Sequence, residues 1–531
     1  MRGFRSVEVP REQLVLWEQR LDDAIPPDHP VRQVDYLLSS RVFAETFREW
    51  ERSYVLVEGK PPYHPRTMAG LYIYGMLNGI RSSRRLEAAC YNRLDVIWLM
   101  EGQHPDHSTI ADFVKTRGRH LKSMFRDVAQ VAQRAGLIRL GQAAVDGTKI
   151  EANAGKKSVH KEQRLAEELS ILEEQIAGLE REWEANEARE KNLFGQEVPW
   201  SPRGSLSDKK RLASMKRQQA RLAKCLSVIE RRRAASASST KPKAIASTSD
   251  PDSRVMRDKE GRRKPNYNGQ IATDTEHGMI VAEDVNDAAE DSGQLIPMVD
   301  QVAVNCGRLP DAVSADSQYN TGPDLAALEA RGVVGYVPDA GTNSEVPRET
   351  SPAVQAVEKA HRGEKLTEEE WAALPRSNKL IRKTAFRYDS ESDVYVCPTG
   401  ERLGFLRSSQ HRRNGRVVRC RQYGGCRACA TCAHGSFCCQ DPTKGRTIKR
   451  DQYELYRERM RSRMQEESGR SRYALRKQTV EPRIGEIKHV RGVRRFLHRG
   501  LEAVRHEWTL VCTAVNIGIL LRHWEKVAAV L

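Results

Sequence analysis

The sequence predicts an α/β protein in which helices pack on a mixed sheet, with helical segments at both ends of the chain. Short apolar runs alternate with helical patterns between 267 and 337. Apolar residues recur at helical spacing before 135 and again after 451. Two heptad seams interrupt the chain between the first predicted strand and the others. These three observations predict the fold class.

Length and charge bound the function. The chain has 531 residues and a net charge of +17. At about 150 residues per domain, that length predicts three or four domains. The positive charge favours a polyanionic partner, most often nucleic acid. The apolar run WTLVCTAVNIGILL is too short to span a bilayer, and the first residues, MRGFRSVEVPREQ, carry no apolar signal core. We therefore expect a cytoplasmic protein with no membrane partner.

The first 135 residues predict a helical domain, because apolar positions recur at helical spacing and Pro, Asp and Gly separate the segments. Basic clusters, such as RSSRR from Arg81, suit DNA contact, although a solvated surface would look the same. The run Leu140–Ile150 then predicts a strand with Asp146 near its end.

A long insertion follows that strand. Its two seams are Leu165, Leu169, Leu172, Ile176 and Leu179, and Leu212, Met215, Leu222, Leu226 and Ile229. Heptad spacing on two helices joined by FGQEVPWSPRGS predicts an antiparallel coiled-coil hairpin. The short connection favours closure of the hairpin on itself over pairing between two protomers. The polar segment AASASSTKPKAIASTSD predicts a linker.

Regular structure resumes at Tyr267. NYNGQIATD and MIVAEDV flank TEHG, which predicts a β-hairpin, and alternating helices and strands follow up to Val337. The resulting segments are a helical N-terminal domain (1–135), the first part of the core (136–155), the hairpin (156–235), the linker (236–264), the continued core (265–340), a Cys-rich insertion (341–450) and the C-terminal part of the core (451–531).

Acidic residues at strand ends indicate possible chemistry. Asp146 and Asp316 each end an apolar run, and strand ends of an open sheet face a common crevice. Glu481 precedes Pro482, where a helix is predicted to begin, and Lys488 follows two turns later on the same face. Carboxylates bind Mg²⁺ and Mn²⁺, so metal-assisted phosphodiester chemistry is indicated. The pattern alone does not choose these acids over the others nearby, which are Asp274, Glu283, Asp284, Asp287 and Asp291.

The cysteines are clustered. Seven of the 11 lie between Cys397 and Cys439, and three of them form C-x2-C-x2-C. Tetrahedral Zn²⁺ accepts four thiolates, and this spacing delivers them from a short loop. We predict one structural zinc ion; its ligands are Cys426, Cys429, Cys432 and either Cys438 or Cys397. Free buried cysteines and an iron–sulfur cluster are the alternatives.

Three blocks resemble the motifs of bacterial insertion-sequence transposases of the DDE type, in the branch with a Tyr-x2-Arg-x3-Glu-x6-Lys signature. They are AVDGTKIEANA, VSADSQYNT and RKQTVEPRIGEIKHVRGVRRFLHRGL. The segment from HPRTMAGLYIYGML to PDHSTIADF resembles the helical N-terminal domain of that branch. The resemblance implies a ribonuclease-H-like core with Asp146 on the first strand, Asp316 after the fourth strand and Glu481 on a later helix.

The resemblance also implies a function. Such a protein binds terminal inverted repeats, hydrolyses phosphodiesters at the element ends and joins the 3′-hydroxyl ends to target DNA with two Mg²⁺ or Mn²⁺ ions. Double-stranded DNA, a homodimer and a nucleoid-associated location follow from it. The alternatives are a ribonuclease-H-like nuclease without strand transfer and a zinc-containing DNA-binding protein without catalysis.

The same signature implies DNA contacts by Tyr473, Arg476 and Lys488. Four residues rather than three separate Arg476 from Glu481, so Lys477 fits the spacing and the phosphate contact stays open between the two. Glu486 is the rival third acid, but its spacing to Lys488 is wrong. The basic run after Lys488 adds predicted DNA contacts, which are Arg491, Arg494 and Arg495.

Overall fold

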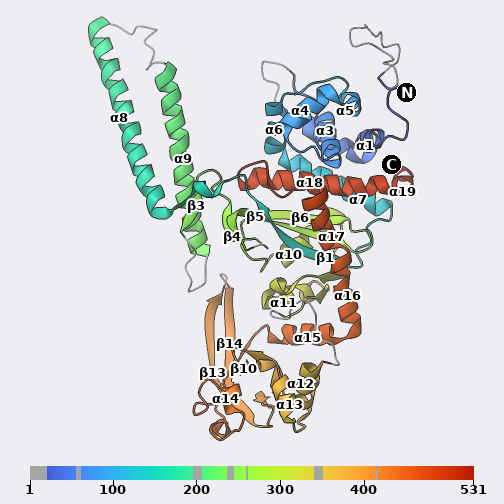
Figure 1. Cartoon of the computed structure of the whole chain (residues 1–531), viewed down its shortest axis with the longest axis vertical. Coiled ribbons are helices and arrows are strands. Elements are labelled where there is room, and N and C mark those ends of the chain that lie inside the picture. Colours follow the sequence, from blue (N-terminus) through green and yellow to red (C-terminus); the bar gives the residue numbers. More distant parts are fainter. Residues whose placement is uncertain are drawn as a thin grey trace, which may run out of the picture. The chain divides into compact units, whose positions relative to one another are not determined.

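The computed structural model describes residues 21–54, 61–194, 206–235, 244–258, 261–339, 351–413 and 416–531. They form two compact units (Figure 1): one runs up to Leu137 and includes Thr509–Leu531, and the other is Ile138–Trp508. The last helical segment, predicted as core, therefore groups with the N-terminal helices from Thr509 onward. Among the described residues, no helix is long and apolar enough to cross a membrane.

The first unit is helical, as predicted. Its helices are α1 (Pro30–Ser39), α2 (Ala44–Arg52), α3 (Pro65–Leu77), α4 (Ser83–Asn92), α5 (Leu94–Leu99), α6 (His107–Thr116), α7 (Gly118–Arg134), the end of α18 (Leu501–Arg522) and α19 (Trp524–Ala528). Helix α3 begins at Pro65, whose missing N–H costs nothing at that position. It buries ten of its 13 residues, so it is the central helix of the unit.

The second unit is built on a mixed sheet in the order β4-β5-β1-β7-β8, with β6 also paired to β5. The strands are β1 (Ala143–Glu151), β4 (Arg254–Arg257), β5 (Arg263–Asp274), β6 (Ile280–Asn286), β7 (Ala312–Ser314) and β8 (Val334–Tyr336). Strand β1 is central: it is antiparallel to β5 and parallel to β7. Helices α10 (Leu295–Cys306) and α11 (Gly322–Ala330) connect the later strands. This is the predicted mixed α/β layer.

Two details of the core differ from the prediction. The first strand runs from Ala143 to Glu151, so Asp146 lies inside the strand rather than near its end. The segment predicted as a linker contains β3 (Ile245–Ser247) and β4. Strand β3 pairs with the distant β2, and β4 pairs with β5, the next strand along the chain. Residues 236–243 of that segment lie outside the described residues.

Helices α8 (Glu162–Phe194) and α9 (Leu206–Ala235) form the inserted hairpin, and β2 (Val159–Lys161) pairs with β3 at its base. The predicted seam residues Leu165, Leu172, Ile176, Leu222 and Ile229 are buried, together with Cys225. Leu169, Leu212, Met215 and Leu226 pack partly buried against them. Leu179 is half-buried and outside this cluster. The predicted connection lies almost entirely outside the described residues.

The Cys-rich insertion has its own sheet, in the order β11-β12-β13-β14-β15. Its elements are α12 (Pro352–Arg362), α13 (Glu368–Ala373), β9 (Arg376–Ser377), β10 (Leu380–Ile381), β11 (Arg387–Asp389), β12 (Val394–Val396), β13 (Arg402–Arg413), β14 (Arg416–Gly424), α14 (Gly435–Cys438) and β15 (Ile448–Asp451). Buried aromatic side chains form its core, among them Trp371, Phe386, Tyr395 and Tyr423. The insertion is thus a folded subdomain rather than a long loop.

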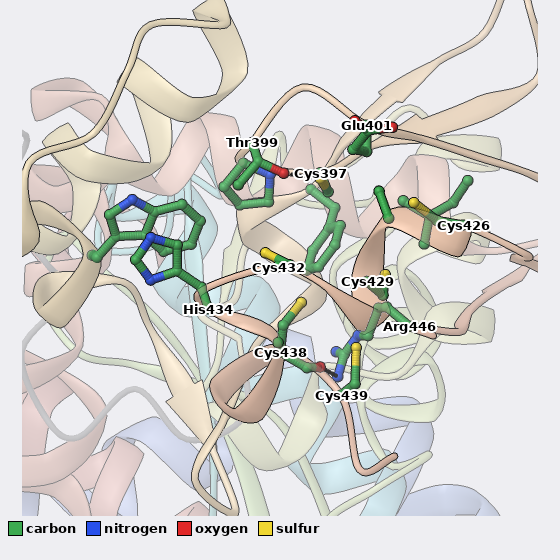
Figure 2. Close-up of a pocket in the computed structure, with 16 residues that line it drawn as sticks. Cys397, Thr399, Glu401, Cys426, Cys429, Cys432, His434, Cys438, Cys439 and Arg446 are labelled. Carbon is green, nitrogen blue, oxygen red and sulfur yellow. Dashed lines mark hydrogen bonds between the residues drawn. The ribbon is translucent and has the colours of Figure 1, made fainter. Parts of the chain in front are cut away.

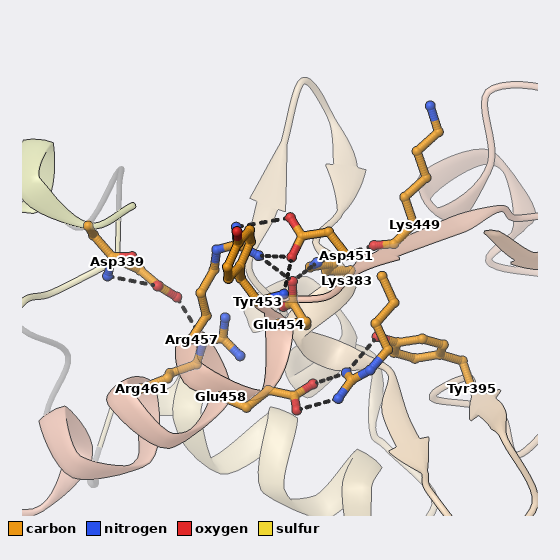
Figure 3. A network of polar contacts seen from close by, with 12 residues as sticks. Asp339, Lys383, Tyr395, Lys449, Asp451, Tyr453, Glu454, Arg457, Glu458 and Arg461 are labelled. Carbon is orange, nitrogen blue, oxygen red and sulfur yellow. Dashed lines mark hydrogen bonds and ion pairs between the residues drawn. The ribbon is translucent and has the colours of Figure 1, made fainter. Parts of the chain in front are cut away.

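Polar contacts hold this insertion to helix α15 (Glu454–Gln465), as Figure 3 shows. Arg450 of β15 pairs with Glu458, and Arg457 pairs with Asp451 at 2.9 Å. Glu454, only 2% exposed, also accepts from Arg457 and from Lys383. Because α15 packs on α11 and β8 of the core sheet, the network fixes the insertion to the core. Helices α16 (Glu467–Gln478) and α17 (Val480–Gly485) continue from α15.

Candidate active site

Asp146 lies on the central strand. Its carboxylate accepts a hydrogen bond from the backbone N–H of Gly147 at 2.8 Å. A Cβ atom at Gly147 would come within 2.4 Å of the Gln270 side chain and 2.5 Å of the Asp291 carboxylate. Only glycine fits there, so the Asp-Gly pair in AVDGTKI reflects close packing between β1 and its neighbours.

Asp316 follows the adjacent parallel strand, β7. It begins the short 3₁₀ helix η3 (Ser317–Tyr319), and its carboxylate accepts from the Gln318 N–H at 2.9 Å. Because β1 and β7 are neighbours, Asp146 and Asp316 influence each other. Burial raises the pKa of Asp146 to about 6, and the charge of Asp316 adds to that rise. Burial likewise raises the pKa of Asp316. The two acids form one electrostatic site.

Arg476 on α16 supplies the opposite charge. It is 5% exposed, and its Nη2 lies 3.3 Å from Oδ2 of Asp146. Its guanidinium also donates to the Tyr473 hydroxyl at 3.2 Å, and its charge opposes the pKa rise of both acids. Lys477, the other candidate for the phosphate contact, is exposed. Of Arg476 and Lys477, it is therefore Arg476 that faces the two acids.

Glu481 lies in the first turn of α17 and is exposed. A backbone break at Thr479, with φ −122° and ψ −77°, separates α16 from α17, and α17 packs on β1. The charges of Glu481 and Asp316 both raise the pKa of Tyr473, so both acids lie near that side chain. Within the described ranges, no three His, Cys, Asp or Glu side chains form a group that could hold a metal ion. The rival acid, Glu486, pairs with Arg483 and Arg491 at 2.5 and 3.0 Å.

The helix changes its winding after Glu481. Residues Glu486–Val490 form a π-helical turn, η6, which is wider than an α-helical turn and shifts the alignment of Lys488 with Glu481. The Lys488 ammonium donates to the Lys149 carbonyl at 3.0 Å. Among the other predicted DNA contacts, Arg494 and Arg495 are exposed, whereas Arg491 is mostly buried against Glu486.

Asp291 is a further acid beside the site. It is 6% exposed and accepts from the side-chain amides of Asn268 and Gln270, each at 2.6 Å. The Lys149 ammonium lies 3.6 Å away, and the charge of Asp291 contributes to the raised pKa of Asp146. The sequence named Asp291 only as one of several alternatives. The useful signal was the alternation of polar residues in NYNGQ, because these side chains are buried on a core strand.

The raised pKa of Asp146 predicts a dependence of stability on pH. Between the ordinary value of 3.8 and about 6, the native state binds more protons at this group than the unfolded chain. The contribution of Asp146 to the free energy of unfolding therefore falls as the pH rises through this window. We expect the melting temperature of wild type, relative to Asp146→Asn, to decline between pH 4 and pH 6.5 in EDTA. A difference that stays constant over this range would contradict the raised pKa.

The cysteines surround a separate pocket of about 230 Å³ in the insertion (Figure 2). All five predicted zinc ligands line it, together with Cys439 and His434. Burial raises the pKa of Cys426, and the backbone N–H groups of Ala428 and Cys429 oppose that rise. Burial also raises the pKa of Cys429, and the backbone N–H of Arg446 opposes that rise. The sequence missed Cys439 as a ligand candidate, because C-x2-C spacing draws attention to the first three cysteines.

Comparisons with known proteins give three family matches. Two models described as "Transposase DDE domain" match residues 240–374 and 396–521, and one described as "Transposase domain (DUF772)" matches residues 19–116. Asp316 lies in the first of these segments and Glu481 in the second, while Asp146 lies outside all three matches. Neither a curated protein nor a solved structure matches the chain significantly.

Proposed function

We propose that this chain is a DDE transposase that cuts and joins DNA at the ends of an insertion sequence. The three family matches support this proposal. It binds the terminal inverted repeats, hydrolyses a phosphodiester at each end and transfers the 3′-hydroxyl ends to target DNA. The observation that carries the proposal is a pair of partly buried acids in a chain with a net charge of +17. Asp146 lies on β1, and Asp316 lies just after the neighbouring parallel strand β7.

The side chains fit a divalent metal in their chemistry. Asp146, Asp316 and Glu481 are hard oxygen donors, which Mg²⁺ and Mn²⁺ prefer. When bound, two such ions activate the attacking oxygen and stabilise the leaving oxygen. Arg476 neutralises Asp146 in the structure described here, so its guanidinium must yield when the acids take up a cation. It then lies beside the reacting phosphate, where a bidentate contact suits a guanidinium.

The reaction has two steps. In hydrolysis, a water oxygen bonds to phosphorus, and the bond from phosphorus to the 3′-oxygen breaks, leaving a protonated 3′-hydroxyl and a 5′-phosphate. In transfer, that 3′-oxygen bonds to a target phosphorus and displaces the 3′-oxygen of the target strand. Tyr473, Lys488, Arg494 and Arg495 lie on the segment around Glu481 and hold the DNA backbone in this proposal, with Arg476, Lys477 and Arg491 as further contacts. Two element ends must meet, so a homodimer is the active form.

A strand-transfer assay tests the proposal. Precut duplexes that carry the element's own ends are incubated with a supercoiled plasmid and Mg²⁺. Joined products support the transposase, whereas nicking without joining favours a ribonuclease-H-like nuclease. DNA binding with neither activity would leave the binding-only alternative.

We further propose that the cysteine pocket holds one structural Zn²⁺. Cys426, Cys429 and Cys432 supply three thiolates, and either Cys438 or Cys397 supplies the fourth. Cys439, which also lines the pocket, is a further candidate for the fourth position. No three of these side chains stand in a metal-binding arrangement as described, so zinc binding would draw the loop tighter. The support is the gathering of six thiols around one pocket and the orientation of backbone N–H groups toward Cys426.

Metal analysis tests the zinc site. We expect about one zinc ion per chain after purification, loss of that ion in Cys429→Ser and a lower melting temperature after chelation. Cys420→Ser is the matched control, because Cys420 is a buried cysteine of the same insertion that does not line the pocket. Iron with visible absorbance would indicate an iron–sulfur cluster instead, and metal-free protein with intact thiols would contradict a metal site.

A further inference from the structure

Strands β13 and β14 extend beyond the rest of their sheet. Strand β12 pairs with β13 only at Arg402 and Leu403, and β15 pairs with β14 only from Cys420 to Tyr423. Residues 407–413 and 416–421, called the ribbon below, have a third strand only at their base among the described residues, and Figure 1 shows them running out from the insertion. Two-stranded hairpins are marginal alone, so an exposed one needs a reason other than stability.

The composition of the ribbon is unusual. Its residues include six arginines and no Asp, Glu or Lys. Lysine would serve equally well if these charges only kept the protein soluble. A guanidinium differs from an ammonium in presenting a planar fork of donors that can contact two oxygens of one anion, so the use of arginine alone indicates recognition of phosphate or carboxylate.

The register places three of the six ribbon arginines on one face. Gln410 pairs with Arg419, and Arg412 pairs with Val417, so the side chains of Arg412 and Arg419 share a face with Arg421. Successive positions on this face are roughly 7 Å apart along the strand. Arg412 and Arg419 are exposed, and no ion pair to either is found within the described ranges. Arg421 instead pairs with Asp393 and packs over the Phe405 ring at 4.7 Å.

The base of the ribbon is held firmly. The Tyr423 hydroxyl donates to Asp393 at 2.6 Å, and its ring is buried in the core of the insertion. Strand β15, next to β14, carries Arg450 and Asp451 of the network that joins the insertion to α15 (Figure 3). A ribbon fixed at its base loses less conformational entropy when it binds a partner than a free loop does.

We propose that the ribbon binds along duplex DNA, with Arg412 and Arg419 on backbone phosphates. The major groove of B-DNA admits a two-stranded ribbon. Each DNA strand presents a phosphate every ~3.4 Å along the axis, and the turn of the backbone separates neighbouring phosphates further, so charges spaced ~7 Å apart can meet neighbouring phosphates. This inference rests on the proposed function, because that function makes DNA the partner of the chain. It adds a contact surface, remote in sequence from Glu481, that the catalytic residues do not supply.

The test measures duplex binding by full-length protein without catalysis. The probe is a 30-base-pair duplex of random sequence in EDTA, titrated at several NaCl concentrations. For Arg412→Ala/Arg419→Ala, we expect the slope of log affinity against log salt to fall by about 1.8, which is about 0.9 per phosphate contact. Affinity at the lowest salt concentration should fall on the order of tenfold. Arg412→Lys/Arg419→Lys keeps the charges and should recover most of the slope.

The matched control is Arg331→Ala/Arg362→Ala, which removes two arginines outside the ribbon that pair with Asp300 and Glu364. It should leave the slope unchanged. An unchanged slope in the ribbon variant, with wild type still binding, would overturn the ribbon proposal alone and point to an acidic protein surface as its partner. Failure of wild type to bind any duplex would instead overturn the proposed function. Because the ribbon arginines are exposed, the ribbon variants should have the same melting temperature as wild type.

Discussion

Asp146→Asn is expected to abolish nicking and joining of an end duplex in Mg²⁺, with a loss of more than about 10³-fold in rate. Asparagine keeps the shape of the side chain but removes the charge that a divalent ion needs. Asp146 lies on the central strand β1, beside the parallel strand β7 that leads into Asp316, so the substitution removes charge at the centre of the proposed site. Duplex binding in EDTA should persist, because the DNA contacts lie elsewhere.

The control for this prediction is Asp311→Asn. Asp311 precedes β7, its side chain is 70% exposed and it pairs with Arg308 on the surface. Nicking by that variant should equal that of wild type. Glu481→Gln should resemble Asp146→Asn if Glu481 completes the site. Substantial nicking by Asp146→Asn would contradict the assignment of Asp146 as a metal ligand, and only the proposed affinity for DNA would remain.

Arg476→Met is expected to destabilise the metal-free protein by about 3–5 kcal/mol. Arg476 is buried against Asp146, and its charge also acts on Asp316. Removing it leaves two partly buried acids without this cation, and they then either repel each other or must take up protons. Urea unfolding in EDTA measures the loss. The difference from wild type should shrink in Mg²⁺, because bound cations then neutralise the same acids.

The neighbouring residue provides the comparison. Lys477→Met removes a cation of similar length from an exposed position one residue away, so its stability should stay within about 0.5 kcal/mol of wild type. The double variant Asp146→Asn/Arg476→Met should lose less than the sum of the single changes, because the pair is removed together. If Arg476→Met unfolds like wild type in EDTA, the buried ion pair does not exist in solution.

The sequence predicted the helices and the hairpin whose formation depends on residues close together in the chain. The heptads of 165–179 and 212–229 and the turn signal TEHG depend on residues close in sequence, and helices α8 and α9 and the β5–β6 hairpin are found there. Strands β3 and β4 lay hidden in the predicted linker. They are short and carry no alternation, and they exist because β2 and β5 pair with them. Such pairing is not visible in the strand's own residues.

The site shows the same division. The acids at 146, 316 and 481 were reached through resemblance to known motifs, since spacing alone could not choose among nearby carboxylates. The choice between Arg476 and Lys477 depends on how α16 is rotated against β1, which is a tertiary contact. The charge pair of Lys149 and Asp291 joins residues from different elements of the core. Nothing in the residues around Lys149 indicates this partner, because Asp291 lies far away in the sequence.

The strand pair at the base of the helical hairpin has a consequence for how this chain can vary. Val159–Lys161 and Ile245–Ser247 pair antiparallel, so the chain leaves and re-enters the core at adjacent points. The distance between the two points where the arm joins the core is therefore fixed by this strand pair and does not depend on the length of the arm. Lengthening a flexible connection costs only about 0.6 kcal/mol for each doubling. Whole helical turns could therefore be added to or removed from the arm while the core sheet keeps its register.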